Sequence, residues 1–378
     1  MFGHVRAFYY VCKGTKSPIL RCISKCAEQY AQGIVAINYM SQPNYRKRKW
    51  RSQKESYQEA LDYMRGRQRG TITSIKTPWK KFNDAIADGI EWNSTTVIAA
   101  RPGTGKTLIK DQIIREAFTL NKNTSFRVLE FSLEMVGRVS AMRSFSSFIG
   151  RAYKYLCSAD GIITDEDMAK CYAYAKKMIE HPIDIIDEPC TVTEFRETIA
   201  EYMDAHSIQK VDKTGKSYKE YTKTIITLDH SLLLKKAPFE KDKQDTLFAL
   251  GEALTDLKRK YPIAFIVLSQ LNRDIDRPER NEDGKYGNHI LESDIYGSDA
   301  LLQHADTVVG VNRPAKQKIQ YYGVERYIIE DLTVLVFHFI KARNGDTRMS
   351  FMRAEFDKMQ ISEMETPPTQ ERKVTTRS

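Results

Sequence analysis

Apolar and β-branched residues gather in short runs between residues 72 and 356, and stretches with a single apolar face separate these runs. Runs of this length are typical of buried strands, whereas apolar positions spaced three and four apart indicate helices that cover a sheet. Strand and helix patterns that alternate along a chain predict an α/β fold with a mostly parallel central sheet flanked by helices. The runs expected to form strands are residues 95–99, 126–131, 183–186, 224–228, 264–268, 307–311 and 332–340.

The remaining segments divide the chain further. Residues 52–70 contain a predicted helix in which Tyr57, Leu61 and Met64 share one face, and Gly66 follows its last residue. An isolated amphipathic helix ahead of a domain usually packs on another surface outside that helix. We expect residues 1–51 to form a basic N-terminal arm with a helix over 19–37, residues 71–358 to form the main domain, residues 210–223 and 278–291 to be surface loops, and residues 359–378 to be a disordered tail.

Charge is distributed unevenly along the chain. The net charge is +10, yet residues 1–80 hold 16 Lys or Arg and only 4 Asp or Glu, so the remainder is close to neutral. The basic cluster at residues 46–51 could contact phosphate backbones or an acidic partner, and a solvated surface run is an equally good interpretation. The six cysteines form no Cys-x-x-Cys pair, which favours reduced thiols in a cytoplasmic protein. No apolar run is long enough to span a membrane.

A phosphate-binding loop is the clearest chemical signal. Residues 99–107 read Ala-Ala-Arg-Pro-Gly-Thr-Gly-Lys-Thr between a predicted strand and an amphipathic helix. In such a loop backbone N–H groups surround the phosphates, the lysine reaches the terminal phosphates and the last hydroxyl binds Mg2+. Ala100 stands where the usual pattern has its first glycine, but the flanking strand and helix argue against a coincidental turn. We expect the nucleotide to lie among Arg101, Pro102, Gly103, Thr104, Gly105, Lys106 and Thr107.

Two carboxylates follow predicted strands at the edge where this loop would lie. Asp229 closes the run 224–228, and a carboxylate there can hold the metal, although Asp also favours helix N-caps. Glu134 follows the run 126–131 and is placed to orient or deprotonate the attacking water. A glutamate that simply opens the next helix is an equally good interpretation, because carboxylates favour helix N-termini.

Polar residues near two other predicted strands complete the candidate set. Gln270 follows the run 264–268, where an amide could hydrogen-bond the γ-phosphate and report its loss to the next loop. Lys341 and Arg343 come just before an Asn-Gly turn at residues 344–345. That turn is a strong hairpin signal in its own right, so the two cations fit a solvated hairpin. They also fit an arginine finger that reaches the nucleotide of a neighbouring subunit.

In combination, these motifs resemble the ATPase domain of DnaB-type replicative DNA helicases, a branch of the RecA-like motors. The resemblance implies a RecA-like P-loop ATPase that uses ATP and Mg2+, a ring-shaped homo-oligomer of six subunits, and single-stranded and forked DNA as substrates. It also implies that the helix at residues 52–65 is a linker that packs on the adjacent subunit. The implied roles are catalytic base for Glu134, metal carboxylate for Asp229, γ-phosphate sensor for Gln270, and action in trans for Lys341 and Arg343. The motifs lie at residues 100–107, 131–135, 269–273, 293–295, 303–306 and 341–345.

Several positions depart from the pattern of that family. The segment before the linker helix is too short and too basic to match the usual helical N-terminal domain, so a primase or a loader is only a candidate partner. Tyr296 and Gly297 stand where the family usually has an Arg-Glu pair, so we expect DNA contacts there through stacking or backbone N–H groups. Such compact, divergent versions are typical of phages and other mobile elements, whose helicases act in the cytoplasm of a bacterial host. The residues expected to contact DNA are Arg273, Tyr296, Gly297 and Ser298.

Two other functions compete with the helicase. A RecA-type or clock-type ATPase would use ATP to assemble a filament or ring without unwinding duplexes, and particle shape distinguishes it from a helicase. A DNA-binding loader subunit would bind ATP only as a switch and would not need Glu134, Asp229 and Arg343 together. We therefore favour a helicase that grips DNA mainly through phosphates, with loops within residues 272–300.

Overall fold

A computed structural model describes residues 50–212, 214–238, 240–280 and 289–371. The chain separates into two compact units, residues 1–71 and residues 72–378. Most of the predicted N-terminal arm, including the helix expected at residues 19–37, lies outside the described residues.

The first unit contains helix α3, Gln53–Gln68, among its described residues. Ser52 caps this helix: its Oγ accepts a hydrogen bond from the Glu55 N–H at 3.2 Å, and Glu55 Oε2 accepts one from the Ser52 N–H at 2.8 Å. This reciprocal capping box satisfies two N–H groups that a helix end otherwise leaves unpaired. The helix is the one predicted before the main domain, and Tyr57, Leu61 and Met64 on it are exposed.

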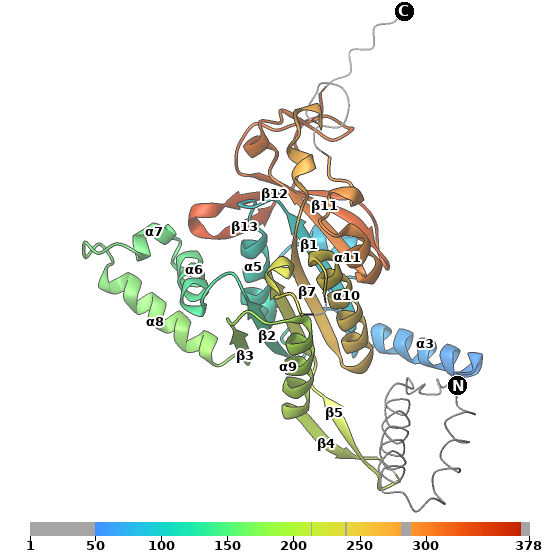
Figure 1. The fold of residues 1–378 in the computed structure, drawn as a ribbon. Coiled ribbons are helices and arrows are strands. Elements are labelled where there is room, and N and C mark those ends of the chain that lie inside the picture. Colours follow the sequence, from blue (N-terminus) through green and yellow to red (C-terminus); the bar gives the residue numbers. More distant parts are fainter. Residues whose placement is uncertain (1–49, 213, 239, 281–288, 372–378) are drawn as a thin grey trace, which may run out of the picture. The chain divides into compact units, whose positions relative to one another are not determined.

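A sheet of nine strands forms the centre of the second unit, in the order β13-β12-β11-β8-β1-β7-β6-β2-β3 (Figure 1). The strands from β8 to β3 are parallel to their neighbours, and β11, β12 and β13 add an antiparallel edge. Every strand predicted from the apolar runs is present, which confirms the α/β fold. The bounds are β1 Ser94–Ala100, β2 Arg127–Ser132, β3 Ile183–Ile186, β6 Thr224–Asp229, β7 Ile263–Gln270, β8 Thr307–Asn312, β11 Val334–Ala342, β12 Met349–Glu355 and β13 Gln360–Glu363.

Helices cover both faces of this sheet. Residues of α9, α10 and α11 belong to the core on one face, and residues of α4 and α5 belong to the core on the other. Helices α6, α7 and α8 pack mainly on one another beside α5. The bounds are α4 Lys80–Ala85, α5 Lys106–Leu120, α6 Gly137–Ile149, α7 Tyr153–Leu156, α8 Asp165–Ile179, α9 Val192–Ala205, α10 Lys243–Lys260 and α11 Ser298–His304.

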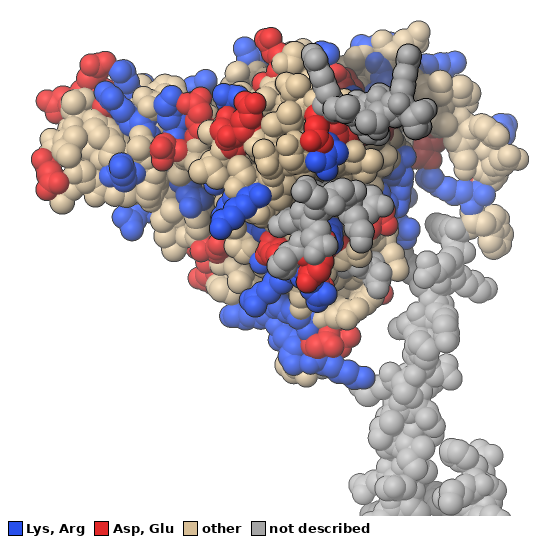
Figure 2. All heavy atoms as spheres, turned by 90° about the horizontal axis from the view of Figure 1, so that it is seen from above, with Lys and Arg blue, Asp and Glu red and all other residues tan. Residues whose placement is uncertain are grey.

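The surface of the second unit carries charges of both signs. Lys and Arg side chains intermix with Asp and Glu over the face seen in Figure 2. This mixture agrees with the near-neutral balance of the chain beyond residue 80. None of the helices within the described ranges combines the length and the apolar character that a membrane crossing requires.

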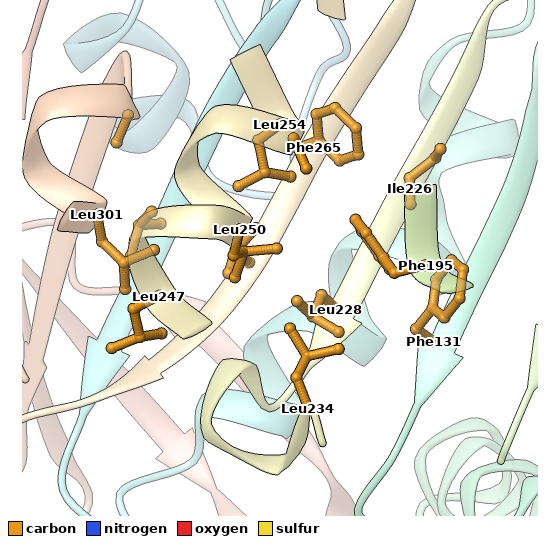
Figure 3. Close-up of a cluster of buried hydrophobic side chains, with 14 of the residues drawn as sticks. Phe131, Phe195, Ile226, Leu228, Leu234, Leu247, Leu250, Leu254, Phe265 and Leu301 are labelled. Atoms are coloured by element: carbon orange, nitrogen blue, oxygen red, sulfur yellow. The ribbon is translucent and has the colours of Figure 1, made fainter. Parts of the chain in front are cut away.

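Burial on both faces explains why the central strands are continuous apolar runs. Successive residues of β7 alternate between the two cores: Phe265 belongs to one and Ile266 to the other. In the first core Leu250 and Leu254 of α10 lie near Phe265, and Phe195 of α9 meets Phe131 of β2 with 4.6 Å between ring centroids (Figure 3).

One prediction about the surface segments was wrong. Residues 210–223 do not form an irregular loop, because β4 Ser207–Val211 and β5 Ser217–Tyr221 pair as an antiparallel hairpin. Its strands are polar and exposed, so the chain lacks the apolar run by which a buried strand is recognised. The loop predicted at residues 278–291 stays a prediction, because residues 281–288 lie outside the described residues; within the described part, Ile290 is buried.

The predicted disordered tail is also wrong over most of its length. Strand β13 pairs with β12 at the sheet edge, and Ile361 within it is buried. The Ile361 carbonyl accepts hydrogen bonds from Trp79 Nε1 and from Gln112 Nε2, each at 3.0 Å. These partners are far away in sequence, so the composition of the segment alone gives no sign of them. Residues 372–378 lie outside the described residues.

Candidate functional site

The predicted phosphate loop joins the end of β1 to the start of α5. Gly103 and Gly105 have φ values of 71° and 111°, in the left-handed region that favours glycine. A Cβ at Gly105 would also lie 3.2 Å from the ring of Phe356. No side chain caps the N-terminus of α5, so this end of the helix presents backbone N–H groups and a partial positive charge that suit a phosphate.

Ala100 shows why this loop does not need the usual first glycine. It is the last residue of β1, is fully buried, and stands in register with Gln270 of β7. Its carbonyl accepts a hydrogen bond from the Leu271 N–H at 3.2 Å. A residue in a regular strand needs no left-handed conformation, so alanine serves here.

Lys106, Asp229 and Glu134 come together although they lie far apart in sequence. Lys106 is only 8% exposed and Asp229 only 1% exposed. Burial lowers the pKa of Lys106, and the nearby carboxylates of Asp229 and Glu134 oppose this effect. The structure therefore places the candidate phosphate-binding lysine, metal carboxylate and base in one electrostatic neighbourhood.

The Asp229 carboxylate is buried without a partner: among the described residues, neither oxygen has a hydrogen bond. Burial raises the pKa of Asp229 to about 6, and Lys110 is the strongest opposing influence. Thr107 also lowers this pKa, although no hydrogen bond of standard geometry joins its hydroxyl to the carboxylate. An unpartnered buried carboxylate near a threonine hydroxyl fits a hard cation such as Mg2+, which prefers oxygen ligands.

A tight turn after β2 holds Glu134 beside this pair. Ser132 stands in register with Asp229, and its Oγ donates a hydrogen bond to the Met135 carbonyl at 2.6 Å. The Leu133 N–H donates to the Asp229 carbonyl at 2.8 Å. Glu134 itself is exposed, and its charge raises the pKa of both Lys106 and Asp229. Its carboxylate is thus near the site and open to water.

Gln270 links the nucleotide site to the loop that follows β7. Its side chain interacts with His230, whose pKa is lowered to about 4 mainly by burial. Its backbone carbonyl accepts a hydrogen bond from the Tyr296 N–H at 2.9 Å. Displacement of Gln270 would therefore also displace the backbone of a predicted DNA-binding residue.

The candidate DNA-binding residues lie at the two ends of the segment that follows β7: Arg273 comes soon after the strand, and Tyr296, Gly297 and Ser298 lead into α11. Arg273 and Tyr296 are exposed. Gly297 has a φ of 64°, in the left-handed region that favours glycine, and a Cβ there would lie 2.4 Å from the end of the Leu247 side chain, which would have to move. Ser298 begins α11, and its side chain lies outside the described structure.

The two candidate trans-acting cations are not brought to the phosphate loop of their own chain. Strand β11 is antiparallel to β8, and Ala342 stands in register with Thr307 at the start of β8. The phosphate loop lies at the opposite, C-terminal ends of the parallel strands. The ammonium of Lys341 donates to the Leu302 carbonyl, and Arg343 pairs with Asp306. Both cations thus contact groups of their own chain at the far edge of the sheet.

Three residues beside the phosphate loop were not predicted from the sequence. The ammonium of Lys316 donates to the Pro102 carbonyl at 3.0 Å. The guanidinium carbon of Arg313 lies 4.1 Å from the centroid of the Phe356 ring. These residues follow β8 and β12, and no local motif marks them. A cavity of about 370 Å³ here is lined by Arg101, Pro102, Thr104, Asp276, Asn312, Arg313, Lys316 and Gln317.

A buried ion cluster on α5 was also missed. Lys110 Nζ lies 2.7 Å from Glu130 Oε2 and 2.8 Å from Asp111 Oδ1. Burial alone would lower the pKa of Lys110, but Asp111 and Glu130 outweigh burial, so the pKa is raised. A lysine in a helix normally indicates a solvated face, and only the packing of α5 on the sheet places this one inside.

Comparisons with known proteins agree with this geometry. A model of the family described as "DnaB-like helicase C terminal domain" matches residues 74–362. Replicative DNA helicase DnaB of Buchnera aphidicola subsp. Baizongia pistaciae (strain Bp) is 28% identical over 244 residues, 64% of this chain and 47% of that relative. Replicative DNA helicase DnaC of Bacillus subtilis (strain 168) is 26% identical over 279 residues, 73% of this chain and 54% of that relative. The chain spans about half the length of these curated relatives.

Solved structures share the fold at low sequence identity. A DnaB-like replicative helicase, described with its interactions with primase, superposes with a TM-score of 0.65 at 17% identity, over 93% of this chain and 81% of that one. A second solved structure, described as an ATPase domain, superposes with a TM-score of 0.64 at 18% identity, over 82% of this chain and 98% of that one. At such identities the likeness concerns the architecture of the domain.

Proposed function

We infer that this chain, which belongs to the family described as the DnaB-like helicase C-terminal domain, is an ATP-dependent DNA helicase that translocates on single-stranded DNA and separates strands during replication. The names of its relatives favour this activity over an assembly-only ATPase or an ATP-switched loader subunit. The observation that carries the proposal is the buried, unpartnered carboxylate of Asp229 near the phosphate loop. A mere nucleotide switch would not need a metal carboxylate together with the water-accessible carboxylate of Glu134.

We assign the steps of hydrolysis to residues of this site. The N-terminus of α5 and Lys106 bind the phosphates, and Thr107 with Asp229 would hold Mg2+. A cation held there would supply positive charge that offsets the negative charge of the phosphates. Glu134 orients the attacking water and accepts its proton. Gln270 senses the γ-phosphate and, through its hydrogen bond to Tyr296, couples hydrolysis to the DNA-binding loop.

We extend the nucleotide site to the base. Arg313 and Phe356 form a stacked pair, and the Phe356 ring lies against Gly105 at the start of α5. Aromatic rings and guanidinium planes both stack on nucleobases. The adenine base would pack on this pair while the phosphates extend toward Lys106.

We propose that Lys341 and Arg343 act on the nucleotide of a neighbouring subunit. Their position at the sheet edge opposite the phosphate loop supports action in trans, because a single chain leaves its own site without them. A ring, expected to be a hexamer, would supply the missing cations at each interface. We also propose that the exposed apolar face of α3 packs on the adjacent subunit, and that a primase or a loader is a candidate partner.

ATP turnover and unwinding of DNA, measured separately, test this proposal. Lys106→Ala and Glu134→Gln should each abolish both single-strand-stimulated ATP hydrolysis and the unwinding of a forked substrate. Lys122→Ala, a change at an exposed lysine on the loop after α5, should retain both. Normal turnover in either site variant would refute the assigned roles, and turnover without unwinding in the unaltered protein would favour the assembly ATPase. Electron microscopy with a non-hydrolysable ATP analogue and single-stranded DNA should show closed rings.

A further inference from the structure

The hairpin of β4 and β5 is a surface element with no part in the nucleotide site. It is inserted between α9 and β6, so it leaves the sheet at the N-terminal end of β6. Because the phosphate loop lies at the C-terminal ends of the parallel strands, the hairpin is at the opposite edge. Figure 1 shows the two strands extending away from the central sheet.

Packing at its base and hydrogen bonds in its turn hold this hairpin in shape. The ring of Tyr221 meets the buried ring of Tyr261 edge-on, with 4.7 Å between centroids. Thr222 Oγ1 donates to the His206 carbonyl at 2.8 Å. In the turn, the Asp212 carboxylate accepts hydrogen bonds from the N–H groups of Thr214 at 2.8 Å and Lys216 at 2.9 Å. The hairpin is therefore an ordered ribbon that can present side chains in fixed positions.

Positive charge predominates on the ribbon and around its base. The nearby carboxylates are already engaged: Glu220 pairs with Lys210 at 2.5 Å, Asp204 with Lys219 at 3.3 Å, and Asp212 is held in the turn. Six described basic residues stand beside these three carboxylates, and although Lys210 and Lys219 are the partners of two of them, a net positive charge remains that suits a polyanion. The basic residues are Lys210, Lys216, Lys219 and Lys223 on or next to the ribbon, and Arg259 and Lys260 at the end of α10.

Apolar and aromatic side chains are interleaved with these lysines. Ile208, Val211 and Tyr218 are 56%, 65% and 47% exposed. Tyr218 stands directly opposite Lys210 in the antiparallel register, so both side chains are on the same face of the ribbon. An exposed aromatic ring beside a lysine can stack on a base while the cation meets a phosphate. A two-stranded ribbon also has a width that the DNA major groove admits.

We propose that this ribbon is a second DNA-contact surface, separate from the loop that carries Arg273 and Tyr296. It binds DNA through backbone phosphates at its lysines and through contact of Tyr218 with a base. The inference deepens the proposed function and rests on it in one respect, namely that DNA is the substrate. Because the ribbon lies at the edge opposite the phosphate loop, it contacts DNA outside the nucleotide-coupled loops.

The test compares charge-matched variants of the full chain. Lys210→Ala/Lys216→Ala removes two lysines from the ribbon, and Lys122→Ala/Lys176→Ala removes two exposed lysines elsewhere. Binding of fluorescent single-stranded, duplex and forked DNA is measured by anisotropy over a range of salt concentrations. The ribbon variant should bind about 10-fold or more weakly near 0.1 M salt, and its log–log salt slope should fall by about 2. The control should match the unaltered protein.

A second pair of variants identifies the kind of DNA that is bound. Tyr218→Ala should weaken binding of single-stranded DNA if the ring stacks on an unpaired base, and Tyr172→Ala, at an exposed tyrosine of α8, should have no effect. Unchanged binding of single-stranded DNA by Tyr218→Ala would overturn the role of Tyr218 and leave the lysines, through phosphates, as the contact.

Two results would overturn the ribbon as a DNA-contact surface. One is unchanged affinity and salt slope in the double-lysine variant. The other is unchanged DNA affinity together with a change in oligomer mass, which would make the ribbon a protein contact. ATP turnover and unwinding by the unaltered protein test the proposed function separately. Loss of DNA binding in the ribbon variant would still support the ribbon if the unaltered protein failed to unwind DNA.

Discussion

Arg343 forms an ion pair with Asp306 of its own chain, with 2.8 Å between Nη1 and Oδ1. The Arg343 N–H also donates to the Asp306 carbonyl at 2.9 Å. The arginine side chain nevertheless remains 54% exposed. A guanidinium held in this way is already ordered at the surface. Replacing the Asp306 carboxylate by a phosphate of a neighbouring subunit would therefore require little additional ordering of the arginine side chain.

The first prediction concerns this arginine. Arg343→Ala should lower the turnover of ATP by about 10^3-fold or more, because the charge that stabilises the transition state is lost. Mixing this variant with Lys106→Ala should restore part of the activity, since some interfaces then combine an intact loop with an intact arginine. Steady-state ATP hydrolysis over a range of mixing ratios measures the effect. Arg353→Ala on β12 serves as the control, and absence of any rescue would exclude action in trans.

The second prediction concerns the proposed base platform. Phe356→Ala should raise the KM for ATP about 10-fold, because stacking on a base contributes on the order of 1–3 kcal/mol. The kcat should change much less, since the phosphates and the water are held by other residues. Phe356→Tyr keeps an aromatic surface and should restore the KM. An unchanged KM in the alanine variant would place the base elsewhere.

The third prediction concerns the buried cluster of Lys110. Lys110→Met should lower the free energy of unfolding by about 3–5 kcal/mol, because Glu130 and Asp111 are left buried without a cation. Lys110→Met/Glu130→Gln removes one of those charges as well and should lose less stability than the single variant. Denaturant unfolding of the two proteins provides the measurement. If the double variant were less stable than Lys110→Met, the unpaired Glu130 carboxylate would not be the cause of the lost stability.

The fourth prediction concerns acid sensitivity. The His338 ring stands edge-on to His289 with 4.2 Å between centroids, and its Nε2 has no hydrogen-bond partner among the described residues. Burial lowers the pKa of His338 from 6.5 to about 3, and His289 adds to this effect. Between those values the unfolded chain binds a proton that the folded chain does not, so this residue destabilises the fold as the pH falls below about 6.5.

Unfolding at two pH values measures this effect. Between pH 7 and pH 5 the titration of His338 should remove about 2 kcal/mol from the free energy of unfolding. His338→Phe keeps a ring of similar size without the titrating group and should lose correspondingly less over that interval. The same pH dependence in both proteins would mean that His338 is not responsible.

The sequence alone determined the parallel strands and the residues at their ends. Strands such as β1 and β7 are buried on both faces, so each appears as an uninterrupted apolar run that can be recognised locally. Lys106, Asp229 and Gln270 follow such runs, and parallel strands bring their C-terminal ends to one edge of the sheet. Their proximity was therefore predictable without coordinates, whereas their catalytic roles stay predictions.

Tertiary structure alone decided what depends on pairing between distant segments. Polar strands such as β5 and β13 have no apolar run, and Ile361 is a core residue because β13 pairs with β12 at the edge of the sheet, where Trp79 and Gln112 also bind its carbonyl. The Arg313–Phe356 pair likewise meets across strands that no local pattern connects. The antiparallel placement of β11 put Arg343 at the edge opposite the phosphate loop. Such contacts arise from sheet order and packing, which local hydrophobic periodicity does not encode.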